Sequence, residues 1–203
     1  MEEKLAGIIL AGGKSSRFGK PKAFAQREGL PFYQYSINAL TPHTDELLIV
    51  TSPELQQRFQ ADSELQVAID VELYRGEGPL AGIYTGMGAM KAEWYLTLPI
   101  DVPFVGKDIF SPLVRQIHPG IQAVVPVTEK KEQPLFAVWH HSVKGIIAEQ
   151  LNNRKRSVHQ LLERLDIREV KMEVDKPFVN INRQEDYEQH IHGDHINQWE
   201  GDR

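Results

Sequence analysis

No cysteine occurs among the 203 residues, so disulfide bonds and thiolate-held metal centres are excluded. Positive charge is not in excess either: 23 Lys and Arg stand against 28 Asp and Glu, so a nucleic-acid backbone is not an expected partner. No apolar run is long enough to span a bilayer, and the opening residues Glu2, Glu3 and Lys4 fit neither a signal peptide nor a transmembrane helix. These absences predict a cytoplasmic protein that binds no membrane and no nucleic acid.

Groupings typical of hydrolytic or histidine-bound metal catalysis are also missing. The chain shows no Ser-His-Asp arrangement, and its histidines gather near the C-terminus as His190, His192 and His195. That spacing could hold a metal, but the surrounding segment lacks periodicity, and we expect it to be a solvated tail. A reaction in which the attacking group is a phosphate, already ionised near neutral pH, needs no general base and agrees with this absence.

Short apolar runs rich in β-branched residues alternate with stretches in which apolar residues return every three or four positions. The runs predict strands at 8–10, 47–50, 67–71, 95–98 and 123–127, and the stretches predict helices at 32–40, 54–60, 80–91 and 109–117. After Pro134 the pattern predicts a run at 135–139, helices at 143–151 and 158–165, and a strand at 168–174. This alternation predicts an α/β fold of the three-layer, Rossmann-like kind, with a mostly parallel central sheet and helices on both faces. The length suits one domain, residues 1–190, followed by a frayed tail, residues 191–203.

The first predicted strand leads into a glycine pair and a cluster of cations. Gly12 and Gly13 lack a Cβ, so their backbone N–H groups can approach a phosphate closely. The cations of this loop are Lys14, Arg17, Lys20 and Lys22. The pattern matches neither G-x-x-x-x-G-K-[ST] nor G-x-G-x-x-G, and a solvated turn is the alternative. Because neighbouring cations repel one another without an anion, the loop predicts a phosphate-binding site.

Carboxylates are expected at the same edge of the sheet as this loop. Asp101 follows a predicted strand in the sequence LPIDVPF, and Asp70 ends another. Ligands of parallel α/β sheets bind outside the carboxyl ends of the strands, so Gly12, Asp70 and Asp101 should lie together. A carboxylate there suits Mg²⁺, which takes one or two protein oxygens and otherwise keeps waters and substrate phosphates. A turn or helix-capping aspartate is the alternative for Asp101.

A turn of small residues, GPLAG at Gly78 to Gly82, opens a predicted helix with Pro79 in its first turn. Small residues leave room for a flat ring against the backbone. Asp70 could then accept hydrogen bonds from guanine N–H groups or from a ribose hydroxyl. A tightly packed helix N-terminus is the alternative interpretation of this turn.

Two asparagines alternate in the sequence FVNIN near the C-terminus. Asn180 and Asn182 share one face of an extended segment. Asn180 is a candidate contact to a second substrate or a metal, whereas Asn182 either contacts a ligand or caps the following helix. Residues 154–156, Arg-Lys-Arg, are either a solvated charge run or help to hold a large anionic substrate.

Several of these segments, taken in order, resemble the molybdenum cofactor guanylyltransferases, the MobA family of the nucleotidyltransferase superfamily. They are LAGGKSSRFGKPK from Leu10, GPLAGI from Gly78, LPIDVPF from Leu98, and the ending FVNINRQEDY. The resemblance runs from Leu5 to Tyr187. Many nucleotidyltransferases share the first motif, but LAGG in place of LAAG, the GPLAGI segment and the Asn-x-Asn ending narrow the match.

The resemblance implies roles for individual residues. GTP would be bound by Leu10, Ala11, Gly12, Gly13, Lys22, Asp70, Gly78 and Asp101. Lys22 and Arg17 would offset charge on the phosphates, and Asp101 would also hold Mg²⁺. Asn180 and Asn182 would bind the acceptor. Some members carry an asparagine at the end of the second strand, where this chain reads Val-Thr-Ser at 50–52.

The implied reaction is transfer of GMP from GTP to the terminal phosphate of molybdopterin or molybdenum-molybdopterin, with release of pyrophosphate. The product would be the molybdopterin guanine dinucleotide cofactor, and other cofactor-biosynthesis proteins and molybdoenzyme chaperones would be further partners. The alternatives are cytidylyl transfer to molybdopterin and nucleotidyl transfer to a sugar or polyol phosphate. A non-catalytic GTP-binding adaptor with the same fold is the second alternative, and the presence of both Lys22 and Asp101 weighs against it.

Overall fold

The computed structural model describes residues 4–12, 21–61, 65–129 and 131–192. Within them the main sheet has the strand order β5-β4-β1-β6-β8-β7-β9. The strands in that order are Val67–Ile69, Glu46–Thr51, Leu5–Ala11, Trp94–Pro99, Val138–His140, Ala123–Val127 and Ile167–Lys171. Strands β5, β4, β1 and β6 are parallel, β8 is antiparallel to both of its neighbours, and β7 pairs with β9 in parallel. The predicted α/β fold with a mostly parallel sheet is confirmed.

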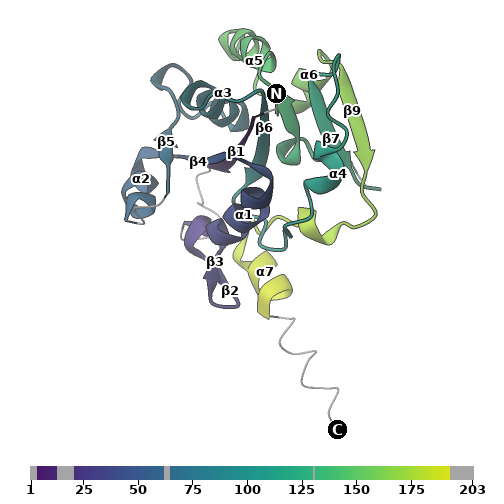
Figure 1. The fold of residues 1–203 in the computed structure, drawn as a ribbon. Helices are drawn as coiled ribbons and strands as arrows, with labels where there is room; N and C mark the ends of the chain where they lie inside the picture. Colours follow the sequence, from purple (N-terminus) through teal and green to yellow (C-terminus); the bar gives the residue numbers. More distant parts are fainter. Residues whose placement is uncertain (1–3, 13–20, 62–64, 130, 193–203) are drawn as a thin grey trace.

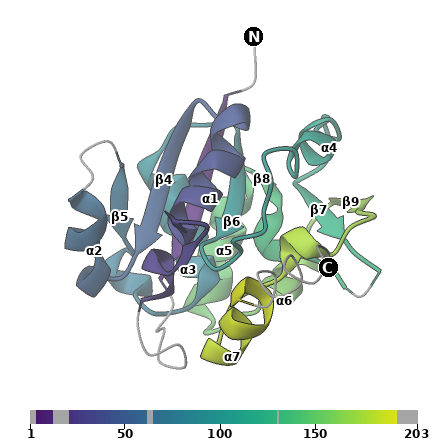
Figure 2. The ribbon, with the colours of Figure 1, turned by 90° about the horizontal axis from the view of Figure 1, so that it is seen from below.

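Helices cover both faces of this sheet. Figure 1 shows α3 (Pro79–Ala89) and α5 (Val143–Asn152) above it and α1 (Phe32–Leu40) below it. The view from below places α1 in front of the strands (Figure 2). One core joins the sheet to α3, α5 and α6 (Val158–Leu162), and the other joins it to α1, α2 (Pro53–Gln60) and α4 (Ser111–Val114). The molecule therefore has the three layers that the sequence predicts.

Strand β1 shows why its sequence is apolar without interruption. Ala6 and Ile8 pack into the core under α3, whereas Ile9 and Ala11 pack into the core on the opposite face. A strand that is covered on both faces must be apolar at every position rather than at alternate ones. Helix α3 approaches β1 closely, because a Cβ placed on Gly86 would lie 2.5 Å from Cδ1 of Ile8.

Several element boundaries differ from the sequence predictions. The helix predicted at 109–117 is α-helical only in α4, and its last turns continue through shorter i→i−3 bonds such as Ile117 N–H to Val114 O. The strand predicted at 67–71 ends at Ile69, because the Val71 N–H donates to Thr85 Oγ1 in α3 instead of to a neighbouring strand. Helix α6 ends at Leu162 instead of at residue 165, and β9 ends at Lys171 instead of at residue 174.

The run predicted at 135–139 contains two elements, the 3-10 turn η4 (Pro134–Phe136) and strand β8, with Ala137 between them. Proline has no N–H to give to a sheet ladder, so the strand starts only after it. The other 3-10 turns are η1 (Lys22–Phe24), η2 (Thr41–His43), η3 (Glu72–Tyr74) and η5 (Lys176–Phe178). A small hairpin, β2 (Gln26–Arg27) with β3 (Leu30–Pro31), has no counterpart in the sequence predictions.

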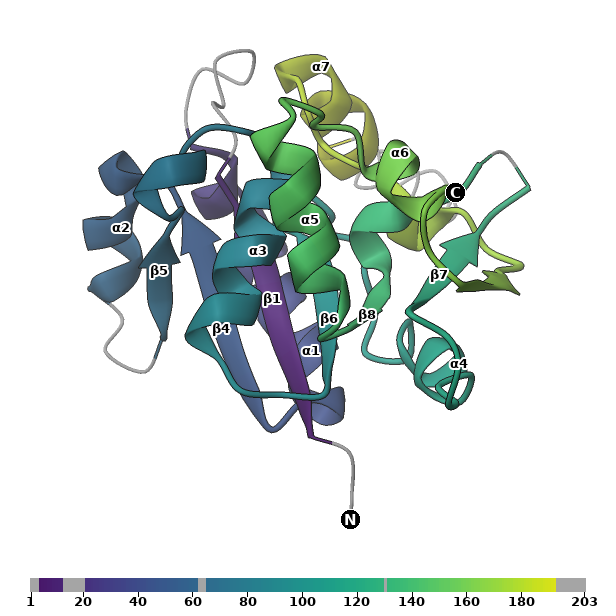
Figure 3. The ribbon, with the colours of Figure 1, turned by 90° about the horizontal axis from the view of Figure 1, so that it is seen from above.

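The C-terminal part of the described chain packs against the N-terminal part. Helix α7 (Gln184–Tyr187) lies beyond the carboxyl ends of β1 and β4 (Figure 3), and the π-helical stretch η6 (Glu188–His192) follows it. Ile191 is only 7% exposed and packs with Ala25, Phe32 and Ile181. The prediction of a frayed tail from residue 191 onward is therefore wrong at Ile191, because the apolar side chain of this residue packs into the core. No helix in the described residues is long and apolar enough to cross a membrane.

Candidate active site

A pocket of about 570 Å³ lies at the carboxyl ends of β1, β4 and β6. Among its lining residues are Leu10, Ala11, Gly12, Lys22, Asp70, Gly78, Asp101 and Asn180, all predicted from the sequence. The structure thus brings together residues from 10 to 180 along the chain. Asn182 does not itself line the pocket but contacts Lys22, which does. The predicted site residues Gly13 and Arg17 lie outside the described residues.

Lys22 contacts two other predicted site residues at once. Its Nζ lies 2.6 Å from Oδ2 of Asp101 and 2.7 Å from Oδ1 of Asn182. The side chains of Lys22 and Asp101 are 13% and 15% exposed, so this ion pair is largely shielded from solvent. A charge-assisted contact of this kind is stronger than one on the open surface. Lys22 therefore links the carboxyl end of the sheet to the C-terminal segment.

The backbone holds Asp101 and the asparagines in the same place. The Ile100 N–H donates to Leu10 O at 3.1 Å, which ties the end of β6 to the end of β1. The Ile181 N–H donates to the Asp101 carbonyl at 2.8 Å, which places Asn180 and Asn182 on either side of that aspartate. A register shift in the C-terminal segment would separate both amides from the pocket.

The helix-capping alternative for Asn182 is not what the structure shows. The N-terminus of α7 is closed by Asp186, whose Oδ2 accepts from the backbone N–H groups of Asn182 and Arg183. The Asn182 side chain accepts from Lys22 instead. Its amide is therefore directed to the site and leaves the helix cap to a carboxylate.

Asp70 lies against the base of α3, and its environment changes its acidity. Burial raises the pKa of the Asp70 carboxyl above its ordinary value, and this effect exceeds the lowering by the Gly76 N–H hydrogen bond and the Arg75 charge. A Cβ placed on Gly82 would come within 3.9 Å of Asp70 Oδ1, so the carboxylate reaches the first turn of α3. A ligand with N–H or O–H donors would favour the ionised form, because it would replace the water that burial removes.

The wall opposite the sheet end is a turn of small residues. Gly76 and Gly78 have φ of +79° and +83°, a conformation that other residues rarely adopt. A Cβ on either glycine would meet nothing within 4 Å, so the wall is open on the pocket side. Gly76 was missed by the sequence analysis, although the Gly-Glu-Gly-Pro spacing could have indicated it. Leu135 also lines the pocket, and it had no such signal because it comes from the irregular stretch before β8.

The donor set fits a hard cation such as Mg²⁺. Asp101 supplies a carboxylate, and the amides of Asn180 and Asn182 supply neutral oxygens near it. Across the residues that the structure describes, no group of three or more His, Asp or Glu residues is placed to hold a metal. A metal at Asp101 would thus complete its coordination with water and substrate phosphates, which is the usual arrangement for Mg²⁺.

A cationic and carboxylate pair at the carboxyl end of a parallel sheet, beside a glycine turn, is an arrangement suited to binding a nucleotide and stabilising charge on its phosphates. Comparison with known families agrees with this interpretation. Residues 7–170 match the family described as the MobA-like NTP transferase domain, and the chain belongs to that family.

Curated relatives and solved structures give the same picture. A probable molybdenum cofactor guanylyltransferase of Bacillus licheniformis is 40% identical over 186 residues, covering 90% of this chain and 94% of the relative. One of Halalkalibacterium halodurans with the same name is 41% identical over 186 residues, covering 89% and 94%. The resemblance found in the sequence is therefore confirmed.

Two solved structures share the fold. Molybdopterin-guanine dinucleotide biosynthesis protein A of Archaeoglobus fulgidus aligns with a TM-score of 0.76 at 21% identity, covering 94% of this chain and 99% of that one. The 4-diphosphocytidyl-2C-methyl-D-erythritol synthase of Anaerococcus prevotii aligns with a TM-score of 0.73 at 14% identity, covering 97% of this chain and 99% of that one. At these identities the likeness concerns the fold alone.

Proposed function

We propose that this chain transfers GMP from GTP to the terminal phosphate of molybdopterin or its molybdenum-bound form and releases pyrophosphate. The observation that carries the proposal is the Lys22 ammonium, which contacts Asp101 and Asn182 at once, in a pocket lined by residues 10–12 and by Gly78, Pro79 and Gly82. The names of the relatives at about 40% identity support the same reaction.

The nucleotide would bind along the sheet edge. The backbone at Gly12 would approach the phosphates, and the small residues from Gly78 onward would lie against the base. Asp70 would accept from the N–H donors of guanine or from a ribose hydroxyl, which agrees with the closeness of its Oδ1 to Gly82 of α3.

The acceptor phosphate would attack the α-phosphorus of GTP in line, and the bond from that phosphorus to the leaving pyrophosphate would break. Lys22 would offset the negative charge that moves onto the leaving group, because an ammonium ion in a shielded site stabilises that charge strongly. Asp101 would hold Mg²⁺, which supplies further charge neutralisation and orients the phosphates. The acceptor phosphate is already ionised, so the site needs no general base.

The acceptor would lie on the side of Asn180 and Asn182. Amides both donate and accept hydrogen bonds, so they suit a ligand with a phosphate and a polar ring system. Lys22 contacts Asn182 as well as Asp101, so it is within reach of both the nucleotide and the acceptor.

The test is to incubate the protein with molybdopterin, Mg²⁺ and each of the four nucleoside triphosphates in turn, and to measure pyrophosphate. Release with GTP alone is the expected result. Release with CTP would indicate a cytidylyltransferase, and release only when a sugar or polyol phosphate replaces molybdopterin would indicate a different acceptor. Binding of GTP without any release would indicate the adaptor.

Base preference can be measured separately by calorimetric titration with GTP, ATP and CTP. GTP should bind well ahead of the other two, because a pocket with polar groups matched to one base leaves them unpaired with another. Equal affinities would contradict the guanylyl assignment and leave the fold assignment intact.

A further inference from the structure

The glycine turn that forms one wall of the pocket is held from outside by the last residue of α5 and the segment that joins α5 to α6. We call residues 152–156 the anchor loop. Arg156 makes a bidentate ion pair with Glu77, with Nε donating to Oε2 and Nη2 donating to Oε1 at 2.9 Å. Tyr74 Oη donates to Oδ1 of Asn152 at 2.9 Å. Two separate contacts thus connect the anchor loop to residues 74–77.

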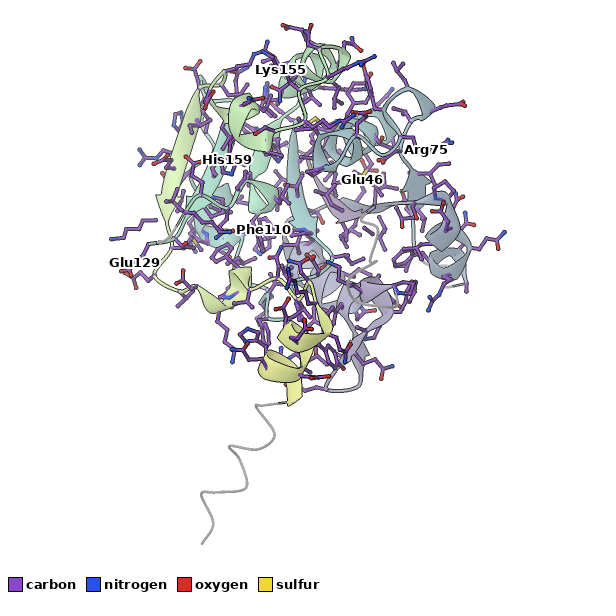
Figure 4. The ribbon with its side chains drawn as sticks, turned by 180° about the vertical axis from the view of Figure 1, so that it is seen from behind. Glu46, Arg75, Phe110, Glu129, Lys155 and His159 are labelled. Carbon is purple, nitrogen blue, oxygen red and sulfur yellow. The ribbon has the colours of Figure 1, made fainter. Side chains whose placement is uncertain are left out.

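The anchor loop is itself firmly placed. Its backbone closes α5 through the Arg154 N–H to Leu151 O at 2.9 Å and the Lys155 N–H to Gln150 O at 3.0 Å. The Gln150 side chain is 1% exposed, and its Nε2 donates to Ser157 O at 2.8 Å on the far side of the loop. Figure 4 labels Lys155 of this loop and Arg75 of the glycine turn. The loop can therefore act as a fixed support.

The glycine turn needs such a support. Gly76 and Gly78 both adopt positive φ, and glycine loses more conformational freedom on ordering than any other residue. The turn belongs to no strand, and its backbone makes local bonds such as the Glu77 N–H to Tyr74 O at 3.0 Å. Its Gly76 N–H also holds the Asp70 carboxylate. Movement of the turn would displace both the wall and that carboxylate.

We propose that Arg156 and Asn152 are positioning residues for the nucleotide: through Glu77 and Tyr74 they hold the Gly76–Gly78 turn in the place where the nucleoside packs, without touching the nucleotide themselves. The inference rests on the proposed function, because it takes the glycine turn to be the nucleoside wall. Neither Arg156 nor Asn152 lines the pocket, whereas Gly76 and Gly78 do.

Because the ion pair is exposed to solvent, its effect on nucleotide binding can be measured apart from any effect on folding stability. The side chains of Arg156 and Glu77 are 59% and 28% exposed. An ion pair this open to water adds little to folding stability. A displacement of about 1 Å in a binding site, by contrast, can change a catalytic or binding constant by one or two orders of magnitude.

The experiment measures GTP affinity by calorimetry in the absence of acceptor, for wild type and for Arg156→Gln, Glu77→Gln and the double variant. We expect each single variant to weaken GTP binding by about five- to tenfold, with an unchanged melting temperature. The double variant should be no weaker than either single one, because both remove the same contact. Arg156→Lys keeps the charge but loses the bidentate geometry, so it should restore part of the affinity.

The matched control is Arg164→Gln, which breaks another exposed ion pair of the α5–α6 region, Arg164 with Glu149 at 2.9 Å. Neither residue of that pair lines the pocket, so GTP affinity should stay at the wild-type value. Tyr74→Phe tests the second contact, because it removes the hydroxyl that binds Asn152 and keeps the buried ring.

The pH dependence of GTP binding gives a second readout. The Gly76 N–H lowers the pKa of Asp70, so a loosened turn should raise that pKa further and move the acid-side loss of GTP affinity to higher pH. Arg75, the charged neighbour of Asp70, and the pocket residues Lys22 and Asp101 are unchanged in the Arg156 and Glu77 variants. Arg164→Gln should leave the pH dependence of GTP binding unchanged.

Unchanged GTP affinity together with a raised KM for the acceptor would overturn the inference and assign Arg156 to acceptor binding. A fall in melting temperature that accounts for the whole loss of affinity would also overturn it, in favour of a structural role. A wild-type protein that binds CTP instead of GTP would contradict the guanylyl proposal alone, and the same variants would then be measured with CTP. Absence of binding to any triphosphate would contradict both.

Discussion

The side of the pocket proposed to bind the nucleotide, here the nucleotide side, is part of the regular sheet, whereas the proposed acceptor side depends on an irregular C-terminal segment. On the nucleotide side, Gly12 and Asp70 directly follow the parallel strands β1 and β5, and Asp101 lies two residues after the end of β6. The neighbouring strands fix the ends of these strands through continuous ladders of hydrogen bonds. This half of the site is therefore preformed.

On the acceptor side, residues 179–183 belong to no strand or helix. The described contacts to the pocket are the Ile181 N–H to the Asp101 carbonyl and the Asn182 amide to Lys22. Ile181 of this segment is fully buried and packs with Ala25, Phe32 and Ile191, so side-chain packing rather than a strand ladder holds the segment in place. On the proposed assignment, the regular sheet positions the nucleotide, and a segment outside the sheet, anchored by its side chains, positions the acceptor.

The largest effect is expected where the two sides meet. Asp101→Asn keeps the size of the side chain but removes the charge that a hard cation requires, so turnover should fall by a factor on the order of a hundred or more. GTP affinity should fall less, because the glycine backbone and Lys22 remain. Steady-state kinetics and calorimetry measure the two effects, with Asp108→Asn, an exposed aspartate outside the pocket, as the control. Near-normal turnover in Asp101→Asn would show that this residue serves only the turn.

The rigidity of the nucleotide side can be tested through the contact of α3 with β1. In Gly86→Ala the new methyl group would lie 2.5 Å from Cδ1 and 2.7 Å from Cγ1 of the fully buried Ile8. Such overpacking should lower the free energy of unfolding by about 1–3 kcal/mol. Gly88→Ala in the same helix meets only the end of the Lys144 side chain at 3.1 Å and should be neutral or stabilising. Chemical denaturation measures both, and equal effects at the two positions would show that α3 does not press on β1.

The acceptor side is tested with Asn180→Ala. Loss of an amide that binds the acceptor should raise the KM for the acceptor by about tenfold, since a lost hydrogen bond to a polar ligand is worth roughly 1–2 kcal/mol. GTP affinity should change little, because Asn180 lies on the C-terminal segment. Equal loss of both affinities, with a lower melting temperature, would instead indicate that the segment is a structural part of the nucleotide side.

The smallest effects concern the acidity of Asp70. Its pKa is raised by burial, and a bound donor would lower it, so GTP affinity should decline by a few-fold as the pH falls through that raised pKa. Asp70→Asn should remove this pH dependence. A carboxyl whose pKa is raised on folding favours the folded state at low pH, and that contribution is lost as the pH rises through the folded pKa. Asp70→Asn should therefore be slightly more stable than wild type at neutral pH, and an unchanged pH profile would exclude Asp70 from nucleotide binding.

Much of the fold and half of the site follow from local patterns. Helix α1 and strand β7 begin and end where the hydrophobic periodicity places them, because the period of apolar residues directly reflects the period of the backbone. The sequence predicts that Asp70 and Asp101 lie at the same edge of the sheet, because the carboxyl ends of parallel strands meet there. The antiparallel direction of β8 was not predictable, since a three-residue strand after a proline carries no signal for its orientation.

The sequence by itself determined the α/β class, the parallel strands, the GPLAG turn and the family, because each is encoded in the spacing of residues close together in the chain. Only the tertiary structure decided that Lys22 would bind both Asp101 and Asn182, and that Arg156 would reach Glu77. These partners are separated by dozens of residues or more in the chain. Their meeting depends on how strands, helices and loops pack around two cores, which no local period records.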